Sequence, residues 1–172
     1  MPQPEQTQLL AFLDVVLVED NVAIRGGTLI TDMQTKPYEF RCTGPVRPTN
    51  LQRILYGATL DDYVYVDLIG IPLLKAAKEK PALVLIQNEL LLRVRPTVAY
   101  PMVLLDAPSQ TRTTGKQQIS MRVHPDFKNE LPAVQTLLGP LMDQRDLMEP
   151  FGRLRIALEE AHRQGIAEKK EK

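Results

Sequence analysis

Three aspartates stand at positions where a carboxylate could do chemistry. Asp14 lies inside the apolar run 9–18, where an ionised carboxylate is costly unless it is paired or bound to a metal. Asp106 ends another apolar run, and Asp32 follows the glycine-containing segment 22–31. Carboxylates that meet at strand ends can hold Mg²⁺ or Mn²⁺ and support two-metal hydrolysis of a phosphodiester. One hypothesis therefore makes Asp14, Asp32 and Asp106 catalytic, with Asp14 and Asp106 as metal ligands. The other makes Asp14 a structural acid that pairs with an arginine, with no metal and no cofactor.

Basic residues suggest two places where phosphate could bind. Arg112 and Lys116 lie in the polar segment 107–117, and Arg47 and Arg53 lie in and just after a proline-rich segment that leads into a predicted helix. Arginine, lysine and helix N-termini all bind phosphate. The first segment is not a P-loop, because Gln117 follows Lys116 where that motif has Ser or Thr. The alternative for the first segment is an exposed loop between strands. The alternative for the second is a rigid connector whose arginines bridge to Asp61, Asp62 or Asp67.

Cysteine and histidine are too scarce for a structural zinc site. Cys42 is the only cysteine, and His124 and His162 are the only histidines, whereas such sites use four ligands of these types. Cys42 shares the apolar side of an alternating strand with Tyr38 and Phe40, so we expect it to pack rather than react.

Hydrophobic patterning predicts strands over 9–18, 22–31, 37–43, 81–87, 98–106 and 118–123. Helices are predicted over 49–57, 59–74, 127–142 and 146–164. This order favours an α+β fold with a mixed, mostly antiparallel sheet, packed helices and a helical C-terminal segment. Gly26 and Gly27 interrupt the second strand and indicate a bulge or a close backbone approach.

The order of elements over residues 9–87 resembles the start of a ribonuclease H-like fold. It has a strand with an internal aspartate (Asp14), a glycine-containing strand, a third strand, a helix and another strand. The resemblance is one of topology, and Asp14 is its only matching residue. It implies a nuclease that cleaves phosphodiesters with carboxylate-bound metal ions.

The chain length predicts one domain, or one domain with a helical appendage. The order of elements divides it into a sheet domain over 1–125, a helical segment over 126–166 and a charged tail over 167–172. The last helix carries an apolar stripe, which packs on its own sheet or docks a partner subunit. The stripe consists of Leu147, Phe151, Leu154 and Leu158.

Composition sets limits on function. The chain has 172 residues with 21 basic and 21 acidic side chains, so a generally basic nucleic-acid-binding surface is excluded, although a local basic patch is not. The chain has no apolar run long enough to cross a membrane and no secretory signal pattern, which predicts a cytoplasmic location.

Because no complete catalytic motif is present, the leading prediction is a non-enzymatic binding or adaptor subunit, with a protein or a second copy as partner. The alternative is a ribonuclease H-like metal-dependent nuclease or nucleic-acid-binding domain. A third hypothesis is a regulatory domain that binds a small anion near Arg47 and Arg53.

Overall fold

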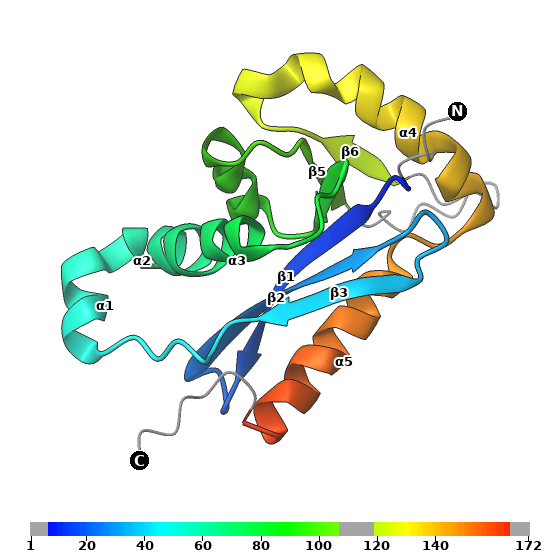
Figure 1. Cartoon of the computed structure of the whole chain (residues 1–172). Coiled ribbons are helices and arrows are strands. Elements are labelled where there is room, and N and C mark those ends of the chain that lie inside the picture. Colours follow the sequence, from blue (N-terminus) through cyan, green and yellow to red (C-terminus); the bar gives the residue numbers. More distant parts are fainter. Residues whose placement is uncertain (1–6, 107–118, 166–172) are drawn as a thin grey trace, which may run out of the picture.

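A six-stranded mixed sheet forms the centre of the molecule (Figure 1). The computed structural model describes residues 7–106 and 119–165. The strands are β1 (Leu10–Val18), β2 (Ala23–Thr31), β3 (Pro37–Cys42), β4 (Leu83–Ile86), β5 (Met102–Asp106) and β6 (Ser120–Arg122), in the spatial order β3-β2-β1-β4-β5-β6. The first three strands are antiparallel, β4 and β5 run parallel to β1, and β6 is antiparallel to β5. The predicted α+β class and mixed sheet are confirmed.

Helices cover both faces of the sheet (Figure 1). One face carries α2 (Leu60–Asp62), the π-helix η2 (Tyr63–Gly70), α3 (Ile71–Ala76) and the 3-10 helix η3 (Glu89–Thr97), whereas α4 (Leu131–Gln144) and α5 (Glu149–Arg163) cover the other. The helix α1 (Asn50–Tyr56) and the 3-10 turn η1 (Gly57–Thr59) lead into the first layer, and the 3-10 helix η4 (Pro125–Glu130) leads into the second. No helix in the described ranges is long and apolar enough to cross a membrane.

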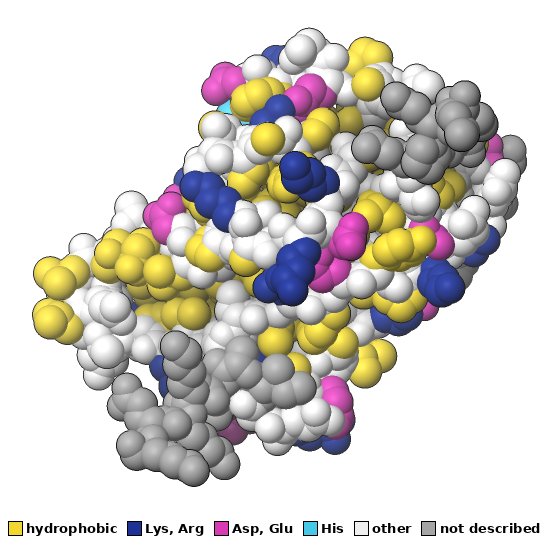
Figure 2. Space-filling model, viewed as in Figure 1, with side chains coloured by type: hydrophobic (Ala, Val, Ile, Leu, Met, Phe, Trp, Pro, Cys, Tyr) yellow, Lys and Arg dark blue, Asp and Glu magenta, His cyan; other side chains and the backbone are white. Residues whose placement is uncertain are grey.

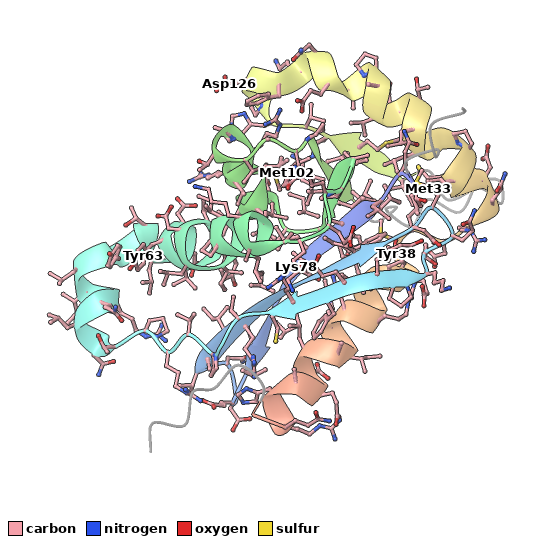
Figure 3. The ribbon with its side chains drawn as sticks, viewed as in Figure 1. Met33, Tyr38, Tyr63, Lys78, Met102 and Asp126 are labelled. Carbon is pink, nitrogen blue, oxygen red and sulfur yellow. The ribbon has the colours of Figure 1, made fainter. Side chains whose placement is uncertain are left out.

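Strand β1 is the middle of the core because it is covered on both faces. Ala11 and Leu13 pack under η2 and η3, while Leu10 and Phe12 pack under α5. A strand covered on both faces is a continuous apolar run rather than an alternating one, which is why 9–18 lacks a polar side. Met102 of β5 is similarly enclosed (Figure 3).

The paired glycines of β2 let helices approach the sheet closely on both faces. A Cβ on Gly26 would lie 2.0 Å from Cγ2 of Ile69 in η2, and a Cβ on Gly27 would lie 2.6 Å from Cδ2 of Leu158 in α5. The β1–β2 register runs through both glycines without a shift. Of the two predicted explanations, the structure therefore supports close approach.

The apolar stripe of the last helix belongs to the core of this chain. Its four side chains are all fully buried: Leu147, Phe151, Leu154 and Leu158. Phe151 packs edge-to-face on Phe12 of β1, with ring centroids 5.2 Å apart. The prediction that this stripe binds a partner is corrected, because its apolar surface is already used inside the domain. The domain division at residue 125 stays a prediction.

Strand β5 is shorter than expected. The predicted strand 98–106 begins only at Met102, because η3 occupies residues 89–97 and Pro101 has no N–H to donate to a ladder. β5 is an interior strand between β4 and β6.

Both signs of charge are interspersed over the face seen in Figure 2. This distribution agrees with the zero net charge of the chain. A functional site is therefore expected at a local cluster of charged side chains rather than over a whole face.

Candidate functional site

The sheet has a step at the carboxyl ends of its parallel strands. Strand β4 pairs with β1 only as far as Leu13, and β1 then continues to Val18 beside β2. Gln87 follows β4 directly, and Asp106 is the last residue of β5. In open sheets with parallel strands, ligands bind outside the carboxyl ends of those strands. We call this place the strand-end step.

The first polar group at the strand-end step joins Asp14, Gln87 and Arg155. The Asp14 side chain is almost fully buried, and its Oδ1 accepts from the Val15 amide at 2.9 Å while its Oδ2 accepts from Nε of Arg155 at 2.7 Å. Arg155 also donates to Oε1 of Gln87. Burial raises the pKa of Asp14, and the lowering effects of the Val15 amide and the Arg155 charge only partly offset it. Asp14 is therefore a buried acid held by one arginine.

The second polar group joins Asp106, Glu89 and Arg122. Nε of Arg122 lies 2.8 Å from Oδ2 of Asp106, and its Nη1 lies 3.1 Å from Oε1 of Glu89. The hydrogen bond and the charge of Asp106, followed by those of Glu89, raise the pKa of Arg122. About half of the Arg122 side chain is exposed, at 48%.

The structure does not bring the three predicted catalytic carboxylates together. Asp14 lies on the α5 face, whereas Asp106 continues the alternation of Leu104 on the opposite face, two strand spacings or roughly 10 Å away. Asp32 is five residues beyond Gly27, the partner of Asp14, which is about 17 Å along the sheet. There its carboxylate accepts from the amides of residues 34 and 36.

These positions do not fit a shared metal ion. Residues 7–106 and 119–165 hold no cluster of three His, Cys, Asp or Glu side chains with the spacing of a metal site. Both oxygens of Asp14 already accept hydrogen bonds. The prediction of a metal site at Asp14 and Asp106, with or without Asp32, is therefore wrong, because the strand order and register keep these carboxylates apart.

The predicted phosphate-binding residues divide into two sets. Arg112 and Lys116 lie outside the described residues. Arg53 is exposed on α1, and Arg47 forms a two-pronged ion pair with Glu19. Arg47 is thus a connector residue, as the alternative interpretation expected, although its partner is Glu19.

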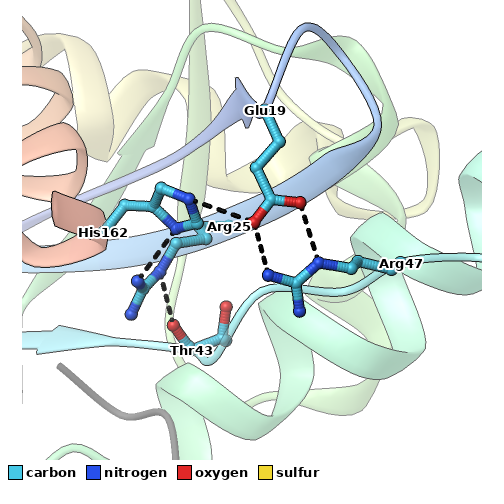
Figure 4. Close-up of polar contacts among 5 residues, drawn as sticks. All are labelled: Glu19, Arg25, Thr43, Arg47 and His162. Carbon is cyan, nitrogen blue, oxygen red and sulfur yellow. Dashed lines mark hydrogen bonds and ion pairs between the residues drawn. The ribbon is translucent and has the colours of Figure 1, made fainter. Parts of the chain in front are cut away.

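A polar cluster ties the end of α5 to the β1–β2 hairpin (Figure 4). Nε2 of His162 lies 3.3 Å from Glu19, and its Nδ1 lies 3.3 Å from Nη1 of the fully buried Arg25. Nε of Arg25 donates to the Thr43 carbonyl at 3.0 Å. The hydrogen bond from Arg47, ahead of smaller contributions from His162, holds the pKa of Glu19 below its usual range. This cluster has a structural role, because it links the end of α5 to the β1–β2 hairpin.

Sequence reasoning missed Gln87, Glu89 and Arg155 as members of the strand-end step. Gln87 and Glu89 follow a buried apolar run, and the same signal had drawn attention to Asp106. Arg155 has no local signal, because it meets Asp14 across 141 residues of sequence.

Asp14→Asn is expected to leave the free energy of unfolding at pH 7 unchanged or slightly higher, because it removes a buried charge whose pKa is raised by burial. With a raised pKa in the folded chain, the contribution of Asp14 to stability is full below its ordinary pKa and is lost as the pH rises through the raised value. Asparagine removes the buried charge and can still accept from Val15. Urea unfolding at pH 7 and at pH 4.5 should show the difference between the two proteins shrinking at the lower pH.

The matched control is Asp126→Asn. The Asp126 side chain is 82% exposed and projects from η4 (Figure 3), so it should change stability little at either pH. A variant Asp14→Asn that is clearly less stable at pH 7 would mean that the Arg155 ion pair outweighs the cost of burial.

The order and directions of the strands define the topology of the sheet. Three antiparallel strands are followed by helices and by two strands parallel to the first, in the order β3-β2-β1-β4-β5. This strand order, with these directions, is that of a ribonuclease H-like topology. The topology that the sequence resembled over residues 9–87 is confirmed, and it places Asp14 on the first strand of the sheet.

Solved structures of endonuclease V show similarity to this chain. Human ENDOV has 13% identity and a TM-score of 0.47, over 78% of this chain and 58% of that one. Two Ciona intestinalis endonuclease V structures are complexes with DNA that contains an inosine followed by a ribo-adenosine. One has 13% identity and a TM-score of 0.40, over 83% of this chain and 58% of that one. The other has 12% identity and a TM-score of 0.41, over 80% and 58%.

This chain therefore spans less than two thirds of the length of the endonuclease V chains compared with it. No family model and no curated protein matches its sequence.

The prediction of a non-enzymatic adaptor subunit is wrong. Its main positive support was the apolar stripe around Phe151, and that stripe packs against β1 and β2 of the same chain.

Proposed function

We propose that this chain is a nucleic-acid-binding domain that contacts the phosphate backbone at the strand-end step through Arg122 and Arg155. The observation that carries the proposal is that both arginines lie at the ends of the parallel strands with close to half of each side chain exposed, 48% and 44%. Carboxylates hold them there. The ion pair of Arg122 with Asp106 is exposed on both sides, and such pairs are weak. A phosphate can therefore replace the carboxylate on Arg122, often with two parallel hydrogen bonds, whereas Arg155 would add its charge while it stays paired with the buried Asp14.

The sequence adds positive charge next to this place. Strand β5 ends at Asp106 and β6 begins at Ser120, so the connection that carries Arg112 and Lys116 starts and finishes beside the step. We include both residues in the proposed phosphate contacts. The DNA held by two of the compared structures is consistent with this proposal, which rests on the strand-end geometry and not on that likeness.

Binding to labelled single-stranded RNA, single-stranded DNA and duplex DNA tests the proposal, with fluorescence anisotropy measured over a range of salt concentrations. Arg122→Gln with Arg155→Gln should weaken binding about 10- to 100-fold and lower the salt slope by about two units, because each phosphate contact contributes about one. The loss should be similar for different base sequences, since phosphate contacts carry no base information.

The control is Arg153→Gln with Arg163→Gln, which removes the same charge from α5. These side chains pair with Glu149 and Glu160 of their own helix and not with the acids of the strand-end step. An equal loss in both double variants, or no binding by the unmodified chain, would contradict the proposal. Incubating the same labelled nucleic acids and Mn²⁺ with the unmodified chain and with Asp14→Asn measures whether the chain cleaves them and whether cleavage needs Asp14.

A cytoplasmic location suits a nucleic-acid-binding domain, and imaging of a tagged chain tests it.

A further inference from the structure

The helix α1 exposes large apolar side chains to water. Leu51, Ile54 and Leu55 are 63%, 77% and 72% exposed, and α1 has no buried residue. Hydrophobic side chains gather over this part of the molecule, at the left of Figure 2. Leu17 and Val22 of the β1–β2 hairpin are also large and exposed, and the hairpin tip lies at the same end of the molecule as α1 (Figure 1).

Local interactions hold α1 as a formed helix, although none of its residues is fully buried. Thr49 and Gln52 make a reciprocal capping box, and Gly57 ends the helix with φ 52° and an amide that donates to the Arg53 carbonyl. Tyr56 stacks on Tyr63 of η2, with ring centroids 4.4 Å apart. The apolar side chains of α1 are therefore presented from an ordered backbone, which suits a surface for docking.

The size of this apolar surface is that of an interface centre. Three large aliphatic side chains at this exposure present roughly 400 Å², which matches the largest apolar patch on many monomers. A stable interface buries roughly 800 Å² on each partner, with an apolar centre and a polar rim. The three side chains of α1 would supply the centre, and the polar residues beside them the rim.

The charges beside α1 suit a second copy of this chain. Arg53 is exposed on α1, and Asp61 and Asp67 are exposed on the helices that follow it. Tyr56 of α1 stacks on Tyr63, which lies four residues before Asp67 on the same helix, so Asp67 lies near α1. A surface with one cation and two anions can pair with itself, whereas its acids repel nucleic-acid phosphate.

We propose that two copies of this chain associate through α1, with Ile54 near the two-fold axis and Arg53 of each copy facing Asp61 or Asp67 of the other. This interface is separate from the strand-end step, so it does not depend on nucleic-acid binding. Sedimentation equilibrium of the full chain at micromolar concentration is expected to show a dimer.

Ile54→Asp is expected to weaken the dimer at least about tenfold, because a charge would enter the apolar centre. The matched control is Ile156→Asp, on α5, where the isoleucine is 67% exposed and stands alone, and it should leave the dimer intact. Because both side chains project into solvent, neither change should disturb folding, which circular dichroism verifies.

Charge exchange tests the pairing itself. Arg53→Asp and the double variant Asp61→Arg with Asp67→Arg should each be mostly monomeric, and a mixture of the two should form heterodimers. A monomeric unmodified chain, or equal effects of Ile54→Asp and Ile156→Asp, would overturn the proposal. So would an Ile54→Asp chain that still dimerises but binds RNA or DNA more weakly, because α1 would then contact nucleic acid instead.

Discussion

Gly26→Ala is expected to lower the free energy of unfolding by about 3 kcal/mol, the upper end for overpacking a core. The added Cβ would lie 2.0 Å from Cγ2 of Ile69, which is far inside van der Waals contact. Ile69 is fully buried and β-branched, so it has no other rotamer to adopt without moving η2. Urea unfolding followed by circular dichroism measures the loss.

The control for this prediction is another glycine in the same chain. A Cβ on Gly152 of α5 would meet no atom within 4 Å, so Gly152→Ala should raise the free energy of unfolding by about 0.5–1 kcal/mol through its better helix propensity. If Gly26→Ala were as stable as the unmodified chain, η2 would not pack against β2 as closely as described.

Phe151→Ala is expected to lower the free energy of unfolding by about 3–5 kcal/mol. Phe151 is fully buried, and its ring meets Phe12 of β1 edge-to-face, so the change loses apolar burial, an aromatic contact and the packing around a new cavity. The same unfolding measurement applies.

Ile156→Ala on the same helix is the control, because its side chain is 67% exposed and should change stability by no more than about 0.5 kcal/mol. A small effect of Phe151→Ala would instead mean that α5 contributes little to the fold and is available to a partner. The two variants therefore separate a core helix from a docking helix.

Much of the fold was predictable because its signals are local. The run 9–18 is apolar on both sides since both faces of β1 are covered, and this pattern depends only on neighbouring residues. The paired glycines predicted a bulge or a close approach from a similarly local signal, and the structure has the close approach. Nothing nearby in the sequence says that η2 and α5 are the elements that approach.

The candidate site was predictable only in part. The placement of Asp14 in an apolar strand predicted a costly acid in need of a partner, and the structure pairs this buried acid with Arg155. The prediction that Asp32 lies beside Asp14 is wrong because β2 runs antiparallel to β1. β2 therefore ends beside Leu10, where β1 begins. Asp106 failed because alternation along β5 turns its side chain to the other face.

The sequence by itself determined the strands, the main helices, the α+β class and the cost of an acid at position 14, since these depend on residue periodicity, turn residues and burial along a short stretch of chain. Only the tertiary structure decided that Arg155 pairs with Asp14, that Arg122 bridges Asp106 and Glu89, and that the stripe of Phe151 is core. These outcomes depend on strand direction, on register and on which helix covers which face. Such choices are made by contacts between residues far apart in the sequence, which a local pattern does not encode.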